Sequence, residues 1–347
     1  MIEFTQGNLL EANAEALVNT VNTDGVMGKG IALQFKRAFP STFLVYEREA
    51  RAGRLATGKV LIDEVRGLHG PRFIIHFPTK RHWRNPSKLS YIDEGLVSLI
   101  AEVRRLGIRS IAVPPLGCGN GGLAWSDVLP RIQAAFAEVP EVKVLLFAPA
   151  GAPPANEMPT RTSRPKMTAG RAAMVAAMGR YRGTGFDYPL TLLEVQKLAY
   201  FMQSAGQPLK LEFTQGSYGP YADELRNVLN RMEGHFVQGW GAGDNKPEQP
   251  IQVLADAVAE AELFLATDAE VQKRFKAVAD LIEDFETPFG MELLSTVHWV
   301  AAHGEDARRD AAAAAAAVQK WNTRKAGLMK PYHVEAAWRR LHDQHWL

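Results

Sequence analysis

The sequence predicts an α/β domain over residues 1–150, a proline-rich linker over 151–168 and a mostly α-helical domain over 169–347. In the first part, short apolar runs alternate with segments of helical periodicity, as in layered α/β folds with a largely parallel sheet. The segment Pro149–Thr168 holds five prolines and almost no large apolar residue, so no regular element fits there. At 347 residues, the chain is long enough for two separate hydrophobic cores.

Five runs rich in β-branched and aromatic residues predict buried strands in the first domain. They are Ala16–Asn22, Gly58–Glu64, Phe73–Pro78, Ser110–Pro114 and Val142–Ala148. Apolar residues three and four apart predict helices over Ile31–Ala38, Leu89–Leu106 and Ser126–Ala137, and we expect Ser126 to cap the last of these. Ligands of such folds bind beyond the carboxyl ends of the strands, so the loops that follow the strands are the candidate sites.

The second domain is predicted to be a set of amphipathic or buried helices. No repeat period links these segments, and seven consecutive alanines in the last one strongly favour a helix. The predicted helices are Leu192–Met202, Tyr221–Met232, Ile251–Ala266, Val271–Phe285, Met291–Ala302 and Asp310–Lys320.

Composition excludes several classes of protein. With 46% hydrophobic and 22% charged residues, the chain is neither disordered nor fibrous. No apolar run approaches the ~20 residues that a membrane span needs, and acidic residues at 3, 11 and 15 do not fit a signal peptide. The single cysteine, Cys118, excludes an internal disulfide and a CxxC zinc site, and the histidines show no ligand spacing. We expect a cytoplasmic protein with no metal, no cofactor and no membrane contact.

Charge is unevenly distributed along the chain. Residues 1–155 carry a net charge of +4, residues 156–182 of +5 and residues 183–347 of −7, while 244–292 alone hold 12 acidic and four basic residues. A basic first half suits a phosphate-bearing ligand, and an acidic second half suits a basic protein surface. The alternative, that the acidic residues only solvate helix surfaces, stays open.

Two glycine-rich loops of the first domain have the composition of a ligand cradle. The first, Asn19–Gly30, has three glycines and two short amides that can follow and bond a sugar, although a flexible connection has the same composition. The second, Pro114–Trp125, has four glycines in six residues between a strand and a helix start. It matches no Walker or Rossmann pattern, but its backbone N–H groups are suited to phosphate, in preference to a purely structural turn.

A third loop, Phe77–Lys88, is rich in cations. Arg81, His82, Trp83, Arg84 and Lys88 surround an aromatic ring with positive charge, which favours contact with nucleic acid over plain solvated surface. Neighbouring cations also disfavour protonation of Lys80, which makes this amine a candidate nucleophile.

These motifs resemble the lysine-dependent branch of the macrodomains, a family that binds ADP-ribose. The resemblance spans the whole first domain through GNLL at Gly7–Leu10, VNTDGVMGKGIA at Val21–Ala32, FPTK at Phe77–Lys80 and PPLGCG at Pro114–Gly119. That branch includes the terminal ADP-ribose glycohydrolases and the DarG antitoxins, which reverse ADP-ribosylation of DNA thymidine by DarT toxins. The resemblance implies a three-layer α/β/α fold with a mixed, mostly parallel sheet.

The resemblance also implies roles for individual residues. Lys80 becomes the catalytic lysine. The DNA contacts Arg81, His82, Trp83, Arg84 and Lys88 are expected from the composition of the third loop and not from the resemblance. Two positions depart from the family pattern, since Asn8 stands where many members hold adenine with an aspartate, and Asn120 and Gly121 stand where some place a helper aspartate. The implied ADP-ribose contacts are Asn8, Leu9, Asn19, Asn22, Gly28, Lys29, Gly30, Thr79, Gly117, Cys118, Gly119, Asn120, Gly121 and Gly122.

The second domain resembles the SocA-like or Panacea antitoxin domains. The similarity rests on LEVQKLAYFMQ at Leu193–Gln203 and on FTQGSYGPYADEL at Phe213–Leu225, where we expect Tyr218-Gly219-Pro220 to form a turn that opens the next helix. An ordinary turn in a helical domain explains the same residues. The match implies a domain that binds and blocks the toxin.

The sequence thus favours an antitoxin hydrolase that removes ADP-ribose from thymidine in single-stranded DNA through Lys80, with a cognate DarT-type transferase as protein partner. Two alternatives stay open: a reader that binds ADP-ribose without catalysis, and a protein that acts by occluding the toxin. Only Lys80 separates the first alternative from an enzyme.

Overall fold

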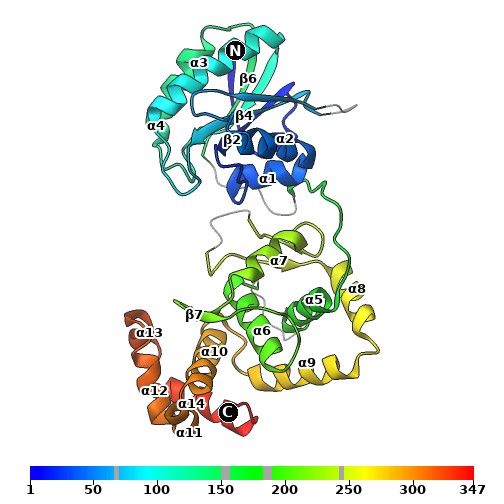
Figure 1. Cartoon of the computed structure of the whole chain (residues 1–347), viewed down its shortest axis with the longest axis vertical. Helices are drawn as coiled ribbons and strands as arrows, with labels where there is room; N and C mark the ends of the chain where they lie inside the picture. Colours follow the sequence, from blue (N-terminus) through cyan, green and yellow to red (C-terminus); the bar gives the residue numbers. More distant parts are fainter. Residues whose placement is uncertain (66–69, 150–156, 183–189, 242–245) are drawn as a thin grey trace. The chain divides into compact units, whose positions relative to one another are not determined.

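The computed structural model describes residues 1–65, 70–149, 157–182, 190–241 and 246–347 (Figure 1). Contacts divide the chain into unit 1, Met1–Ser163 with Gly241–Asp244, and unit 2, Arg164–Trp240 with Asn245–Leu347. Each unit has its own hydrophobic core. Among the described residues, no helix combines the length and the hydropathy that a membrane span requires.

Unit 1 is built on a six-stranded sheet with the order β1-β6-β5-β2-β4-β3. All neighbouring pairs are parallel except β3 and β4, which are antiparallel, so the predicted mixed, mostly parallel sheet is confirmed. The strands are β1 (Ile2–Thr5), β2 (Ala16–Asn22), β3 (Leu61–Glu64), β4 (Phe73–Lys80), β5 (Ser110–Val113) and β6 (Lys143–Phe147).

Helices cover both faces of this sheet (Figure 1). Alternate strand residues point to opposite faces, so Val18 and Ile75 pack with α3 and α4, whereas Leu17 and Ile74 pack with α1. This arrangement gives the expected three layers. The helices are η1 (Leu9–Glu11), α1 (Gly30–Ala38), α2 (Pro40–Arg51), α3 (Leu89–Leu106) and α4 (Trp125–Phe136).

The element predictions for unit 1 need three corrections. Strand β1 was not predicted, because this edge strand is only partly buried and so lacks an apolar run. Helix α2 was also missed, although Pro40 occupies its first turn, where proline is well tolerated. Ser126 is not a cap: the helix begins one residue earlier, Ala124 is its N-cap, and no side chain caps it.

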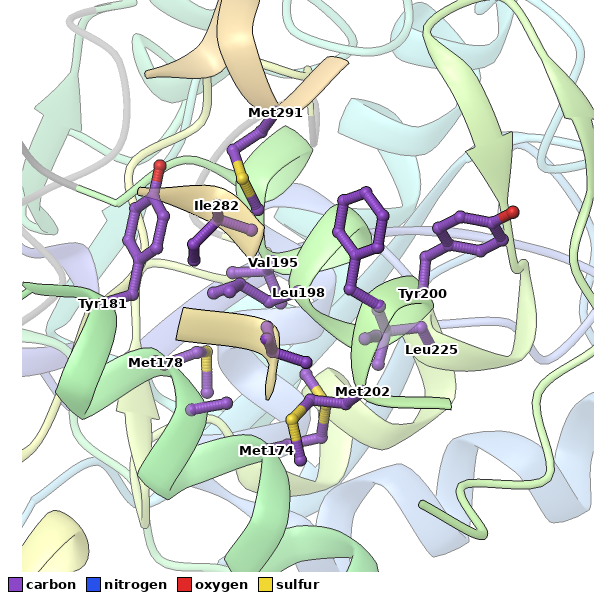
Figure 2. Close-up of a cluster of buried hydrophobic side chains, with 14 of the residues drawn as sticks. Met174, Met178, Tyr181, Val195, Leu198, Tyr200, Met202, Leu225, Ile282 and Met291 are labelled. Atoms are coloured by element: carbon purple, nitrogen blue, oxygen red, sulfur yellow. The ribbon is translucent and has the colours of Figure 1, made fainter. Parts of the chain in front are cut away.

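Unit 2 is mostly helical, as expected. Methionines and tyrosines of α5 and α6 meet residues of α7, α9 and α10 in one buried cluster (Figure 2). The helices are α5 (Ala169–Arg182), α6 (Leu192–Ser204), α7 (Glu224–Met232), α8 (Ala255–Leu265), α9 (Ala269–Ile282), α10 (Pro288–His303), α11 (Glu305–Arg309), α12 (Ala311–Gln319), α13 (Thr323–Leu328) and α14 (Pro331–Asp343).

The segment predicted as a turn opening a helix at Tyr221 forms a hairpin instead. Strands β7 (Thr214–Gly216) and β8 (Gly219–Tyr221) pair antiparallel, and α7 begins only at Glu224. Gly219 has a φ of +94°, which favours glycine at the hairpin turn. A second small pair joins β9 (Val237–Gln238) to β10 (Gln252–Val253), and neither pair was predicted because each strand has only two or three residues.

A buried ionic cluster lies next to Gly219 of the first hairpin. The Lys325 Nζ donates to Glu292 Oε1 at 2.6 Å and to Thr296 Oγ1 at 3.0 Å, and both charged side chains are almost completely buried. The half-exposed Arg324 adds a second cation to Glu292. Nearby, the Lys197 Nζ donates to Pro220 O at 2.7 Å, and burial lowers the pKa of this amine to about 7.

Candidate active site

The three loops singled out in the sequence meet at one edge of the sheet. Strands β2, β4 and β5 are parallel neighbours, so their carboxyl ends and the loops that follow them lie together. Hydrogen bonds join the loops directly. The Thr23 N–H donates to Lys80 O at 3.1 Å, and the Ser87 N–H donates to Gly121 O at 2.9 Å.

The part of the first loop between β2 and α1, residues 23–29, takes its shape from Asn22 at the end of β2. The Asn22 Oδ1 accepts from the N–H groups of Asp24 at 2.9 Å and Val26 at 3.3 Å, and its Nδ2 donates to Val26 O at 2.6 Å. Tyr46 of α2, completely buried, donates its hydroxyl to Asn22 O at 2.8 Å and lies 3.0 Å from Asn22 Oδ1. Among the described residues, these contacts use one of the two amide protons of Asn22, and the residue as a whole is buried, at 8% exposure.

The second loop, Pro114–Trp125, has two of its glycines buried and leaves the others exposed. A Cβ atom at Gly121 would clash with the Gly117 backbone and with Ser87 Oγ, so this glycine closes the loop against Ser87. At Gly119, by contrast, a Cβ atom would meet nothing within 4 Å. The exposed part of the loop, Gly119 with Asn120 and Gly122, is therefore where a ligand can approach the backbone.

Lys80 ends β4 and links the loops. Its Nζ donates to Asn120 O, which places the amine at the exposed tip of the second loop. Burial lowers the pKa of Lys80 below its usual 10.5. This corrects the expectation that neighbouring cations lower that pKa, because Arg81, His82 and Arg84 are exposed to solvent, where their effect is screened.

The third loop presents its cations beside aromatic rings. The Arg84 guanidinium lies 4.5 Å from the Trp83 ring centre, and the His82 ring stacks on Trp83 with 5.6 Å between the ring centroids. Arg81 and Lys88 each lie 5.7 Å from the Tyr91 ring centre. Asp24 of the first loop holds this loop in place by accepting the Trp83 N–H at 3.0 Å. Trp83 remains 45% exposed, enough to stack on a base.

Comparison with known proteins agrees with this geometry. Residues 18–132 match the Macro domain family. A DNA ADP-ribosyl glycohydrolase of Thermus aquaticus is 45% identical over 337 residues, which cover 97% of this chain and 92% of the relative. The chain belongs to the DNA ADP-ribosyl glycohydrolase family. This identification confirms the expected DarG family and the macrodomain fold.

Two further relatives match only part of this chain. A DNA ADP-ribosyl transferase-DNA ADP-ribosyl glycohydrolase fusion protein of Thermosipho africanus is 32% identical over 163 residues, covering 43% of this chain and 42% of the fusion. The solved macrodomain of Mycobacterium tuberculosis DarG is 54% identical and covers 43% of this chain and 99% of that one, with a TM-score of 0.43.

Four of the predicted ADP-ribose contacts have side chains that are buried or hydrogen-bonded within the fold. Asn8 caps η1 by accepting the Leu10 N–H at 3.1 Å and donates to Glu157 O at 2.7 Å. Leu9 and Thr79 are buried, at 6% and 4% exposure. Asn19 is completely buried, with its Nδ2 3.3 Å from His76 Nδ1. The role of these four residues as ADP-ribose contacts stays a prediction.

The remaining predicted residues lie on the three loops. Gly28, Lys29 and Gly30 lead into α1, and Lys29 is exposed. Cys118 is half-buried, and burial raises the pKa of its thiol to about 11, which excludes it as a thiolate nucleophile at neutral pH. Gly117 and Gly121 shape the second loop from inside, while Gly119, Asn120 and Gly122 form its exposed part.

Three residues that support the site were not predicted from the sequence. Tyr46 lies on helix α2, which was not predicted. No pattern in the neighbouring sequence indicates that Tyr46 contacts Asn22. Asp24 has no sequence signal beyond its place in the first loop. Ser87 is 6% exposed, and its Oγ has no hydrogen-bond partner among the described residues. All three residues hold a loop in place. This role can be recognised only in the folded structure.

Replacing Tyr46 with phenylalanine is expected to loosen the first loop. The change leaves the buried Asn22 O without its donor, which costs about 1–3 kcal/mol of unfolding free energy. We expect kcat/KM for an ADP-ribosylated oligonucleotide to fall about tenfold, because Asn22 is no longer fixed. Tyr91→Phe, which keeps the ring facing Arg81 and Lys88, serves as the matched control. Unchanged kcat/KM in Tyr46→Phe would show that the hydroxyl has no role in the site.

Replacing Gly119 with glutamate is expected to weaken ADP-ribose binding at least about tenfold. The position is open, so the fold tolerates a side chain, but the new carboxylate stands where a diphosphate would approach the loop and repels it. Calorimetry with free ADP-ribose measures the effect. Gly119→Gln, which has the same size without the charge, separates repulsion from steric blocking. Wild-type affinity in folded Gly119→Glu would place the phosphate site elsewhere.

Proposed function

We propose that this protein removes ADP-ribose from thymidine in single-stranded DNA, with Lys80 as nucleophile. The observation that carries the proposal is the position of the Lys80 amine, which reaches the exposed tip of the glycine-rich second loop while the first loop lies alongside. Membership of the DNA ADP-ribosyl glycohydrolase family supports the substrate. A DNA substrate and a single cysteine suit the reducing cytoplasm.

The proposed reaction begins when the neutral Lys80 amine attacks the anomeric carbon of the distal ribose. A carbon–nitrogen bond to Lys80 forms as the bond to the thymine nitrogen breaks, and the proton that the attacking amine loses passes to the thymine nitrogen. The sugar ring then opens to an imine with Lys80, and water hydrolyses this imine to release ADP-ribose and the free amine. The partial burial that lowers the pKa of Lys80 increases the fraction of neutral amine.

The loops would divide the binding of ADP-ribose between them. The exposed backbone of Gly119–Gly122 suits the diphosphate, since uncrowded N–H groups at a loop before a helix favour anions. The free Asn22 amide proton suits a hydroxyl of the distal ribose. Together these contacts would hold the anomeric carbon beside Lys80 and so lower the entropic cost of the attack.

We propose that the third loop selects DNA. The double replacement of Trp83 with alanine and Arg84 with glutamate is expected to raise the KM for an ADP-ribosylated oligonucleotide by about tenfold or more, because it removes a stacking ring and a phosphate contact. Affinity for free ADP-ribose is expected to stay within about twofold. The salt dependence of oligonucleotide binding is also expected to become shallower. Equal losses for both ligands would mean that the loop shapes the common pocket.

The proposal is tested by incubating the purified protein with an oligonucleotide that carries ADP-ribose on one thymidine and following the release of ADP-ribose. Release with regeneration of unmodified DNA is the expected result. Tight binding without release would favour the alternative of a non-catalytic reader.

For unit 2 we propose binding to a DarT-type transferase, with residues 169–347 as the interaction domain. The fusion of the two activities in one chain of Thermosipho africanus supports a partnership between such proteins. Occlusion of the transferase would protect DNA in addition to the hydrolysis by unit 1.

The acidic surplus of residues 183–347 does not support this interface by itself. Unit 2 begins at Arg164, and over its full range it holds 21 basic and 22 acidic residues. Of the acidic residues in 244–292 that the structure describes, seven form ion pairs within the unit. The pairs are Asp256 and Glu260 with Arg164, Glu262 with Arg180, Glu270 with Lys273, Asp280 with Lys276, Asp284 with Arg340, and Glu292 with Arg324 and Lys325.

A further inference from the structure

The proposed attack by Lys80 requires one proton to move between two nitrogen atoms. The attacking amine must lose a proton, and the departing thymine nitrogen must gain one. Both nitrogens are bonded to the same carbon during the exchange, so direct transfer between them would pass through a strained four-membered ring. A side chain that first accepts and then donates the proton avoids this geometry.

The three loops of the site contain one carboxylate, Asp24, and one imidazole, His82. Their other ionisable groups are lysine and arginine side chains, which have no lone pair to accept a proton when charged, and Cys118. Burial raises the pKa of the Cys118 thiol to about 11, so the thiol keeps its own proton near neutral pH. The candidates for moving the proton are therefore Asp24 and His82.

Asp24 and His82 follow the ends of the two strands that meet at Lys80. In the parallel pair β2–β4, Lys80 is the register partner of Asn22. Asp24 stands two residues after Asn22, and His82 stands two residues after Lys80. The pairing continues past the strands, because the Thr23 N–H donates to Lys80 O at 3.1 Å. This continuation keeps Asp24 next to the backbone of Lys80, where the reacting sugar carbon has to be held.

Hydrogen bonding favours Asp24 over His82 as the group that moves the proton. The His82 Nδ1 accepts the Arg84 N–H at 3.2 Å, so the neutral ring carries its proton on Nε2 and has no free lone pair. That Nε2 lies 3.8 Å from Asp24 Oδ2, and the same oxygen accepts the Trp83 N–H at 3.0 Å. Among the described residues, the other oxygen, Oδ1, has no hydrogen-bond partner, and the side chain is 33% exposed. Asp24 thus has one oxygen held in place and one available to a substrate.

We propose that Asp24 carries the proton from Lys80 to the thymine nitrogen. The inference rests on the proposed function and adds a second reacting side chain to it. As the carbon–nitrogen bond to Lys80 forms, the amine nitrogen gives its proton to Asp24 Oδ1. The electron pair of the broken bond stays on the thymine nitrogen, which then takes that proton from Asp24. The carboxylate is regenerated in the same turnover, and no proton is consumed.

The test compares two substrates in single-turnover assays with the full-length chain. One oligonucleotide carries ADP-ribose on thymidine and the other on 5-fluorodeoxyuridine, whose more acidic ring nitrogen departs with less need for a proton. Asp24→Asn keeps the size of the side chain and an oxygen that can accept the Trp83 N–H, but it cannot carry a proton. Thr23→Val is the matched control. It removes the hydrogen bond from Thr23 Oγ1 to Arg81 O at 2.8 Å, which joins the same two loops without an acid–base group.

We expect Asp24→Asn to lower the release rate about 100-fold on the thymidine substrate and about tenfold or less on the fluorinated one. Affinity for free ADP-ribose is expected to stay within about threefold of wild type, since the proton moves only in the transition state. Formate, a small external carboxylate, is expected to restore part of the activity of Asp24→Ala. Thr23→Val is expected to change both rates by the same factor, less than about fivefold.

Three results would contradict these expectations in different ways. Loss by the same factor on both substrates, with no recovery by formate, would make Asp24 a structural link between the loops and overturn the inference. An unchanged rate in Asp24→Asn, with thermal unfolding verifying that the variant is folded, would also overturn it while leaving attack by Lys80 intact. Absence of release by the wild type would refute the proposed function itself.

Discussion

Lys80→Ala is expected to lower the rate of ADP-ribose release from modified DNA by on the order of 10³-fold or more, because the reaction loses its nucleophile. Binding of free ADP-ribose is expected to stay within about tenfold of wild type, since the amine contributes mainly in the transition state. Single-turnover release from a labelled oligonucleotide and calorimetry with ADP-ribose measure the two effects.

Two further variants separate the nucleophile from the charge. Lys80→Arg keeps a cation at the site, but the guanidinium stays protonated and cannot attack, so we expect the same loss of activity. Lys59→Ala removes an exposed lysine outside the three loops and is expected to have no effect. In the wild type, the rate is expected to rise with pH through the pKa of Lys80, which burial places below 10.5. Substantial activity in Lys80→Arg would contradict nucleophilic attack by this residue.

Glu292→Ala is expected to lower the unfolding free energy of unit 2 by about 3–5 kcal/mol, because it leaves the buried Lys325 ammonium without its carboxylate. Arg324 is half-exposed and can turn toward solvent, so the loss comes mainly from Lys325. Chemical denaturation followed by tryptophan fluorescence measures the change, since Trp321 lies 5.4 Å from the Lys325 Nζ.

Two comparisons show whether burial causes this effect. Glu270→Gln breaks the exposed pair with Lys273 and is expected to cost no more than about 1 kcal/mol. Glu292→Leu combined with Lys325→Met removes both buried charges and is expected to recover most of the stability. If Glu292→Ala costs as little as Glu270→Gln, the cluster does not stabilise the unit.

The core of the α/β unit could be predicted because burial leaves a strong pattern in the sequence. The strands β2, β4, β5 and β6 and the helix α3 are apolar runs or stripes with clear limits. Edge strand β1 could not be found, since it has few buried residues and pairs with β6, far along the chain. The hairpin β7–β8 could not be found because each of its strands has only three residues. The parallel order of the sheet is what brings the three loops together.

The site was predictable where residue type alone sets the chemistry. Lys80, the glycines of the second loop and the aromatic ring of Trp83 are of this kind. The surroundings of Asn8, Asn19 and Thr79 could not be predicted, because the direction of their side chains depends on strand register and on helix capping, which the sequence does not reveal. The support that Tyr46 gives to Asn22 depends on a contact between residues 24 positions apart.

The most direct test of Lys80 as nucleophile is to trap the imine during turnover. The protein is incubated with an oligonucleotide that carries ADP-ribose on thymidine, in the presence of borohydride, and its peptides are then analysed by mass spectrometry. The proposed reaction predicts a reduced ADP-ribosyl adduct on Lys80 that is absent without substrate. Full turnover under these conditions with no adduct on Lys80 would contradict it and favour direct attack by water.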